Sequence, residues 1–155
     1  MNKILQSLSI VLLLLLSNAC LAALTPQEQA VKKAYEGWCN AIGTAKGDPK
    51  VVVAYYAPNA ILLPTLSGKM LKNENGGLDD YFKKLTSLPN TKCKTDKEII
   101  HMHGDLATNS GFYTFSYTDK NGKTKEIPAR YTFVYKKTGD QWLIIKHHSS
   151  KTPEG

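Results

Sequence analysis

The feature of this sequence that most constrains its fold is a period of two, which begins near residue 92 and continues almost to the end of the chain. Apolar and polar residues alternate there in four runs, which we predict as strands: Lys92 to Met102, Ala107 to Thr118, Lys125 to Lys136 and Gln141 to Ser149. The turns between the runs contain glycine and aspartate and are too short for a crossover helix. The four strands are therefore expected to form an antiparallel meander.

Helical spacing dominates the part of the chain before these strands. Thr25, Pro26 and Glu28 predict a helix start, with a threonine cap, a proline in the first turn and a glutamate that closes a capping box. This helix should end near Gly43, and one apolar face is formed by Val31, Ala34, Tyr35, Trp38, Cys39 and Ile42. We also predict a short helix over 50–56, brief strands over 60–63 and 68–71, and a third helix over 76–85.

The N-terminal residues have the layout of a secretory signal. A short positive start precedes the apolar run from Ile10 to Leu16, and small and polar residues follow it. We expect residues 1–22 to be removed, which predicts a periplasmic or secreted protein without a membrane span, since the apolar run is shorter than the roughly 20 residues that a spanning helix needs. Lipid attachment at Cys20 is the alternative processing route.

Residues 23–155 form one domain by length, with no internal repeat or linker. Helices followed by an antiparallel sheet indicate the α+β class. A long twisted sheet that curls over the first helix would form a cone, with the curved antiparallel sheet packed against the N-terminal helices and a pocket enclosed between them.

The charge pattern argues against nucleic acid as a partner. The chain is formally +7, but its lysines are scattered and Arg130 is its single arginine. Nucleic-acid surfaces usually cluster their basic residues and use arginine for bidentate contacts. A solvated basic surface is the better interpretation.

Two interpretations stay open for the cysteines of the predicted domain. Export to an oxidising compartment would allow Cys39 and Cys93 to form a disulfide. Cys39 also lies on the apolar face of the first helix, where a free cysteine behaves as a small buried hydrophobic residue.

Four segments of the chain resemble a known family: 60–68, 80–82, 128–135, and above all the final strand Trp142-Leu143-Ile144-Ile145-Lys146-His147-His148-Ser149-Ser150. They look like the bacterial relatives of the calcium/calmodulin-dependent protein kinase association (hub) domain, in the nuclear-transport-factor-two-like or SnoaL-like superfamily. The resemblance implies an α+β cone, a deep pocket and a dimer formed through the sheet. It does not imply kinase activity, because the chain lacks the glycine-rich and catalytic loops of kinases.

The resemblance also suggests which side chains line the pocket. It places Arg130 and Thr132 on the pocket side of their strand, opposite Tyr131, and substitutes Tyr113 and Ser149 for further arginines of the family. Arg130 would then bind an anion. The alternative is a structural ion pair of Arg130 with a carboxylate such as Asp80 or Glu126.

His147 is the second candidate site residue. The same alignment places His147 in the pocket beside Ser149, with His148 on the other face. A histidine can shuttle protons near neutral pH, and Asp80 is a further acid/base candidate. The alternative for His147 is a hydrogen-bonded position within the sheet.

Aromatic residues could form the walls of the pocket, and those assigned to it are Tyr35, Trp38, Tyr113 and Phe115. Each of them could equally belong to the core. His101 and His103 share a face of their strand, but no third ligand stands at a recognisable spacing, so we expect neither a metal site nor a cofactor.

Three functions compete at this point. The first is an exported protein that binds a small polar or anionic ligand in a pocket with Arg130, His147 and aromatic residues. The second is a SnoaL-type acid/base enzyme, such as an isomerase, hydrolase or dehydratase, which needs a carboxylate–histidine pair in the cavity. The third is a dimeric interaction or inhibitor module, which would show a filled cavity and an exposed apolar patch.

A homodimer is expected for any of these functions. Tyr131, Phe133 and Tyr135 alternate on one strand, and if the other face of that strand lines the cavity, these aromatic residues form a stripe on the outer face of the sheet.

Overall fold

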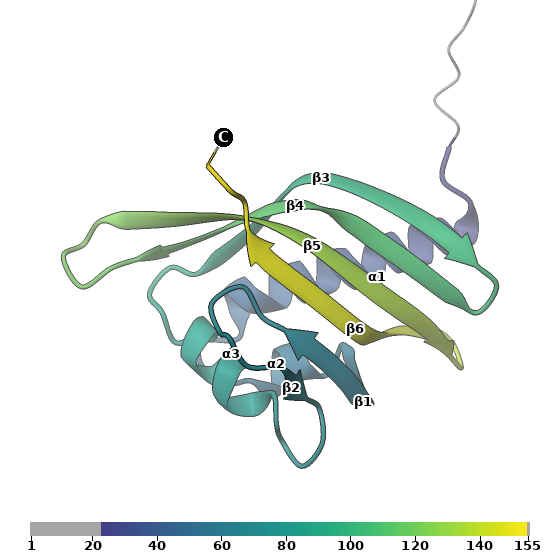
Figure 1. The fold of residues 1–155 in the computed structure, drawn as a ribbon, viewed down its shortest axis with the longest axis horizontal. Coiled ribbons are helices and arrows are strands. Elements are labelled where there is room, and N and C mark those ends of the chain that lie inside the picture. Colours follow the sequence, from purple (N-terminus) through teal and green to yellow (C-terminus); the bar gives the residue numbers. More distant parts are fainter. Residues whose placement is uncertain (1–22, 155) are drawn as a thin grey trace, which may run out of the picture.

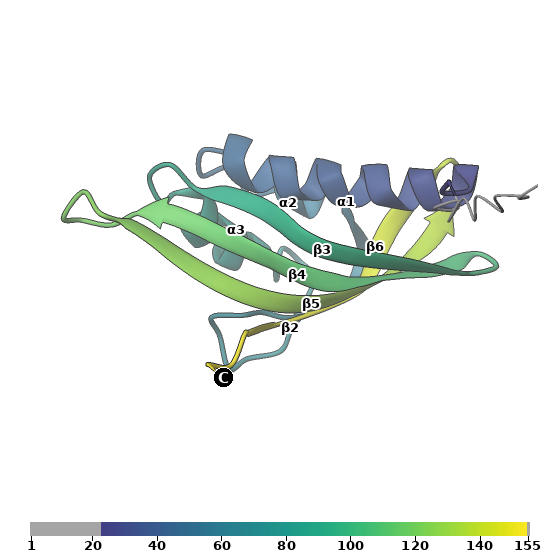
Figure 2. The same cartoon turned by 90° about the horizontal axis from the view of Figure 1, so that it is seen from above.

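The computed structural model describes residues 23–154. The predicted signal segment and Cys20 lie outside these described residues. A curved sheet of six strands in the order β2-β1-β6-β5-β4-β3 forms one layer, and the long helix α1 (Pro26–Thr44) lies along its concave side (Figures 1 and 2). The predicted α+β architecture, with a curved and unclosed sheet packed against helices, is confirmed.

Helix α1 begins and packs as its sequence predicts. The hydroxyl of Thr25 accepts a hydrogen bond from the amide of Glu28, and the Glu28 carboxylate accepts one from the amide of Thr25 at 2.7 Å, which completes the capping box. The residues that α1 buries against the sheet recur at helical spacing: Val31, Tyr35, Trp38, Cys39, Ala41 and Ile42.

The four predicted strands form the antiparallel meander that their short turns require. They are β3 (Lys92–His103), β4 (Leu106–Thr118), β5 (Thr124–Thr138) and β6 (Gln141–Lys151), each paired with the next along the chain. Gly104, Gly122 and Gly139 in the three turns have positive φ angles, which glycine adopts at little cost.

The segment between α1 and β3 departs in detail from its prediction. Helix α2 (Lys50–Val53) is shorter than expected, and β1 (Tyr56–Leu63) begins where the helix was predicted to end. β1 pairs in parallel with β6, which extends the sheet beyond the meander, and the two-residue β2 (Leu71–Lys72) closes that edge. Helix α3 is Asp79–Thr86.

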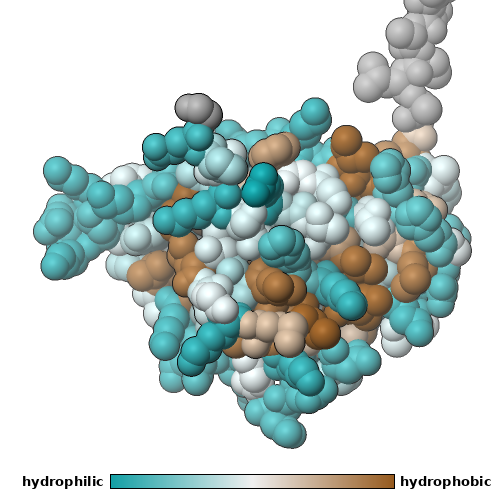
Figure 3. Space-filling view, viewed as in Figure 1, coloured by the Kyte–Doolittle hydropathy of each residue, from teal (hydrophilic) through white to brown (hydrophobic). Residues whose placement is uncertain are grey.

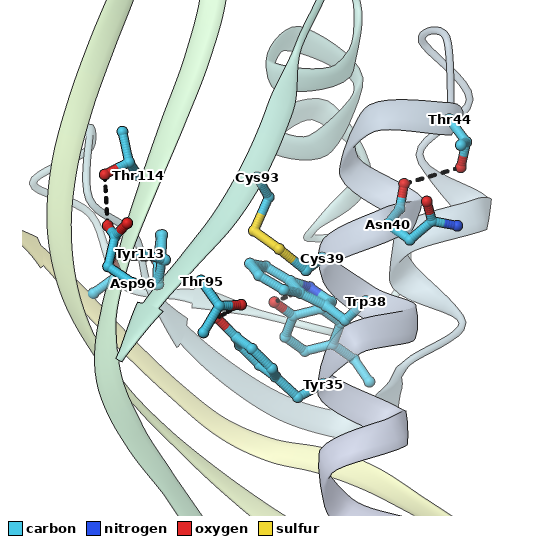
Figure 4. The surroundings of a disulfide bond; sticks show 12 residues. Tyr35, Trp38, Cys39, Asn40, Thr44, Cys93, Thr95, Asp96, Tyr113 and Thr114 are labelled. Atoms are coloured by element: carbon cyan, nitrogen blue, oxygen red, sulfur yellow. Dashed lines mark hydrogen bonds between the residues drawn. A yellow bond between two sulfur atoms is a disulfide. The ribbon is translucent and has the colours of Figure 1, made fainter. Parts of the chain in front are cut away.

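A disulfide bond joins Cys39 on α1 to Cys93 on β3 (Figure 4). The structure therefore selects the bridge over the free buried cysteine. The bond ties the long helix to the edge strand of the sheet across 54 residues of sequence. Within residues 23–154, no helix is long and apolar enough to cross a membrane.

Candidate functional site

The pairing of β5 with β6 decides which side chains reach the interior. Phe133 pairs with His147 and Tyr131 pairs with Ser149, whereas Arg130 pairs with Ser150 on the opposite face. Residues directly opposite each other on neighbouring strands point to the same side of a sheet. His147 and Ser149 must therefore share a face with the aromatic residues of β5, and Arg130 must lie on the other face.

The expected interior position of Arg130 and Thr132 is wrong. Both side chains are exposed on the convex face, and the interior positions of β5 are taken by Tyr131, Phe133 and Tyr135. The aromatic stripe predicted for the outer face is wrong for the same reason. Three large aromatic side chains remove far more apolar surface from water when they face the helix than an arginine and a threonine would.

A β-bulge in β6 shifts the alternation of that strand by one residue, so that even-numbered residues face the interior before the bulge and odd-numbered residues face it afterwards. Val134 pairs with Lys146 and Tyr135 pairs with Ile144, so Ile145 is the extra residue. The buried positions are consequently Trp142 and Ile144 before the bulge and His147 and Ser149 after it. His147 and Ser149 thus lie on the concave side, as predicted, and His148 lies on the convex side.

Inside the cone, a chain of hydrogen bonds links α1, β1 and β6. Trp38 Nε1 donates to the hydroxyl of Tyr56 at 3.1 Å, and the same hydroxyl lies 2.8 Å from His147 Nδ1. Because the tryptophan can only donate, the Tyr56 hydroxyl accepts from it and is free to donate to His147 Nδ1. When the Tyr56 hydroxyl donates to Nδ1, the imidazole is neutral and its proton is on Nε2.

Burial reinforces the neutral state of His147. Desolvation lowers the pKa of this histidine to about 3. The ring of Phe133 stacks on the imidazole with centroids 4.0 Å apart, and the indole of Trp38 meets it edge-on at 5.4 Å. A histidine that stays neutral throughout the physiological range is a poor proton shuttle near pH 7.

A second group of hydrogen bonds joins Tyr113, Ser149 and Thr65. The Tyr113 hydroxyl donates to Ser149 Oγ at 2.6 Å, and Ser149 also shares a hydrogen bond with Thr65. Burial raises the pKa of Tyr113, so its hydroxyl keeps its proton. Tyr113 and Ser149, predicted separately as pocket residues, therefore contact each other directly.

The interior cavity is almost completely filled. It measures about 10 Å³ and is lined by side chains of α1, α3 and the sheet: Trp38, Pro64, Thr65, Tyr81, Phe82, Leu85, Tyr113, Phe115, His147 and Ser149. A single water molecule needs about this much space. Of the predicted site residues, the structure brings Trp38, Tyr113, Phe115, His147 and Ser149 together here.

The remaining interior candidates lie elsewhere. Tyr35 stacks on Tyr131 with centroids 5.1 Å apart and accepts a hydrogen bond from Thr95, so it belongs to the core and does not line the cavity. Asp80 is exposed near the start of α3 and lines a surface hollow beside Tyr81. Sequence reasoning missed Tyr56 and Thr65 as interior polar groups, because the first was predicted as the end of a helix and the second lies between the two brief strands predicted over 60–63 and 68–71.

The convex face of the sheet carries a larger groove, which we call the outer groove. It has a volume of about 560 Å³ and is lined by residues of β3, β4, β5 and β6: Lys97, Ile99, His101, Ser110, Gly111, Phe112, Arg130, Tyr131, Thr132, His148 and Ser150. Figure 3 shows this face, where brown apolar groups lie among pale and teal polar ones. Phe112 is 45% exposed and Ile99 is 52% exposed, which is high for side chains of this kind.

Arg130 is held at the wall of the outer groove by a neutral partner. Its Nε donates to Ser150 Oγ at 2.9 Å. Within residues 23–154, neither Asp80 nor Glu126 forms an ion pair with Arg130. The structural ion pair considered from the sequence is therefore not formed, and the ligand-binding role of Arg130 and Thr132 stays a prediction. Across the same part of the chain, no three histidine, cysteine, aspartate or glutamate side chains are grouped to hold a metal ion.

Comparison with protein families matches residues 27–153 to the family described as "Calcium/calmodulin dependent protein kinase II association domain". The chain belongs to this association-domain family. The match covers nearly all of the described residues, which agrees with the resemblance seen in the sequence. Among curated proteins, none matched the chain at a significant level.

Solved structures support the assignment to the association-domain family. A protein from Xanthomonas campestris assigned to the same family is 36% identical, with a TM-score of 0.75 over 86% of this chain and 95% of that one. The association domain of the C. elegans kinase is 15% identical, with a TM-score of 0.65 over 80% and 95% of the two chains. A protein of the NTF2-like family from Streptomyces avermitilis, named as a dehydratase, is 15% identical, with a TM-score of 0.72 over 84% and 100%. The last two likenesses show the fold alone.

Proposed function

We propose that this protein is an exported association module that pairs two copies through the convex face of its sheet. The observation that carries the proposal is the contrast between the two faces. The concave side is filled by its own aromatic residues, whereas the convex side keeps Phe112 and Ile99 exposed at the outer groove. A filled cavity combined with an exposed apolar patch is the pattern expected of an interaction protein.

The filled interior argues against the two alternatives. A ligand in the cone would have to displace side chains such as Phe115 and Tyr113, because the cavity of about 10 Å³ has room for one water molecule. A SnoaL-type enzyme would pair His147 with a carboxylate, but in residues 23–154 its ring nitrogens have Tyr56 as their single hydrogen-bond partner. The low pKa of His147 also makes it a weak base.

The convex face exposes two large apolar side chains, Phe112 and Ile99, of the kind that interfaces bury. Exposed aromatic residues are enriched where proteins contact one another, and Phe112 projects from β4, which lies between β3 and β5. Homodimers usually pair identical patches around a two-fold axis, and a face formed by four adjacent strands suits that symmetry. Membership of a family named for association supports the same function.

Export is supported by two independent features. The N-terminal residues have the layout of a signal segment, and the Cys39–Cys93 disulfide is of the kind that persists in oxidising compartments. We therefore propose that the module acts in the periplasm or outside the cell.

The test is the mass in solution of the chain that begins at Ala23, measured by light scattering over a range of concentrations. We expect the parent to form dimers and Phe112→Lys to shift the equilibrium to monomers, because the substitution removes an exposed apolar ring and adds a positive charge to a groove that already carries Lys97 and Arg130. Leu66→Lys is the matched control, since Leu66 is 50% exposed but lies outside the outer groove. A parent that stays monomeric at every concentration would reject the proposal.

A further inference from the structure

We infer that the outer groove is a binding site for a small organic carboxylate, which links the two copies of the chain. The inference rests on the proposed function, because it places the ligand on the face through which two copies pair. It is carried by the charge, the hydrogen-bonding groups and the apolar wall of the groove.

The charge of the outer groove has one sign. Its lining includes Lys97, His101, Arg130 and His148 and contains no aspartate or glutamate. Glu98, which follows Lys97, points to the other side of β3, where it pairs with Lys32 on α1 and accepts a hydrogen bond from Asn109. Within residues 23–154, none of the four basic groups takes part in an ion pair. The positive charges of Lys97 and Arg130 are therefore uncompensated within the groove, and such a groove attracts anions.

The hydrogen-bonding groups are arranged to donate to an anion. Arg130 uses Nε to bind Ser150, which orients the guanidinium. Its two terminal nitrogens form no side-chain hydrogen bond within residues 23–154, so they can make a bidentate contact with a carboxylate. The Ser150 hydroxyl accepts from Arg130 and keeps its own proton to donate. The Thr132 hydroxyl likewise accepts a hydrogen bond, from Ser110 at 3.2 Å, and keeps its own proton to donate.

The apolar wall indicates an organic ligand. Phe112 and Ile99 border the basic groups and are about half exposed. The groove of about 560 Å³ is far larger than an inorganic ion requires and falls within the range of roughly 300–1,000 Å³ that is usual for small-molecule sites. A molecule with a carboxylate at one end and an apolar body would satisfy both parts of the groove.

The bound ligand would favour the pairing of two copies by reducing the repulsion between their basic groups. Face-to-face contact would bring the basic groups of one outer groove close to those of the other, and like charges at an interface oppose association. A carboxylate bound beside Arg130 offsets that repulsion. Binding and dimer formation are therefore linked, so that each strengthens the other.

The experiment uses benzoate as the probe and the chain that begins at Ala23, at low ionic strength. Calorimetry should show benzoate binding, with sulfate weaker and benzyl alcohol undetected, because the site needs both the charge and the apolar body. Arg130→Gln should weaken benzoate binding about tenfold or more, the loss expected for hydrogen bonds to a charged group. Lys120→Gln, which removes one positive charge from the exposed turn between β4 and β5, is the matched control and should bind benzoate as the parent does.

Sedimentation of the same samples tests the link to pairing. Benzoate should lower the dimer dissociation constant of the parent several-fold and leave that of Arg130→Gln unchanged. A dimer that neither binds benzoate nor responds to it would overturn this inference and leave the proposed function standing. A chain that binds benzoate through Arg130 and stays monomeric would overturn the proposed function, and with it the link between binding and pairing.

Discussion

Phe133 on β5 lies directly opposite His147 on β6, and the two rings stack with their centroids 4.0 Å apart. This pair defines the interior of the cone, because it joins the aromatic side of one strand to the polar side of the next. It also places Arg130 outside, since Arg130 stands three positions from Phe133 and alternation turns it to the opposite face. This division into two faces decides which substitutions alter the core and which alter the surface.

Neighbouring residues of β5 should differ sharply in their effect on stability. Phe133 is fully buried, so Phe133→Ala should lower the free energy of unfolding by about 3–5 kcal/mol. Arg130→Ala removes an exposed side chain and should change it by no more than about 0.5 kcal/mol. Denaturant titration of both variants checks the prediction, and an equal loss in the two would show that the faces are assigned incorrectly.

The hydroxyl of Tyr56 should contribute substantially to the free energy of unfolding, although it is a single oxygen atom with its proton. Tyr56→Phe leaves both Trp38 Nε1 and His147 Nδ1 without their partner inside the core, so we expect a loss of about 1–3 kcal/mol in the free energy of unfolding. Tyr55→Phe is the matched control, because the adjacent Tyr55 is half-buried and none of the side-chain hydrogen bonds found in residues 23–154 involves its hydroxyl. Chemical denaturation measures both, and equal stabilities would contradict the hydrogen-bond chain.

His147 should make the stability of the domain depend on pH in the acid range. Its pKa is lowered to about 3 in the folded state, against about 6.5 for an unfolded histidine. Between these values the unfolded chain binds a proton that the folded chain does not. The contribution is complete above about pH 6.5 and is lost as the pH falls toward 3, by about 1.4 kcal/mol per pH unit.

The comparison that isolates this histidine is between two adjacent variants. His147→Asn keeps an acceptor near the position of Nδ1 but cannot titrate, so the slope of stability against pH should become flatter. His148→Asn removes a histidine from the convex face and should keep the slope of the parent. If both variants retained the parent's slope between pH 3 and 6.5, the buried neutral state of His147 would be wrong.

The disulfide should contribute substantially to stability. Removing it with the double substitution Cys39→Ala and Cys93→Ala should lower the free energy of unfolding by about 2–4 kcal/mol, because the bond closes a loop of 54 residues in the unfolded chain. Thermal unfolding with and without reductant provides the measurement. The parent should lose stability on reduction, whereas the double variant should not respond.

The N-terminus of the mature protein tests the export proposal. We expect the secreted chain to begin at Ala23 or Leu24, which intact-mass measurement of protein recovered from the periplasm or medium would show. Retention of residues 1–22, or a diacylglyceryl adduct on Cys20, would contradict the predicted processing.

Several parts of this protein follow from local sequence alone. The capping box of Thr25 and Glu28 starts α1, the helical spacing of Val31, Tyr35 and Trp38 sets its buried face, and the short glycine-containing turns require an antiparallel meander. Each of these depends on neighbours within a few residues, so the α+β class is encoded locally. The fold could be predicted from the sequence for that reason.

The candidate site could not be predicted in the same way. Alternation on a strand separates Arg130 from Phe133 but does not state which of them faces the helix. The face that turns toward the helix is the one that buries the larger apolar surface. The orientation of His147 then follows from the β5–β6 register and from the bulge at Ile145. The parallel pairing of β1 with β6, which brings Tyr56 to His147, joins segments distant in sequence. Local patterns carry no information on such pairings. Only the tertiary structure therefore decided that side chains fill the interior of the cone and that Arg130 faces outward.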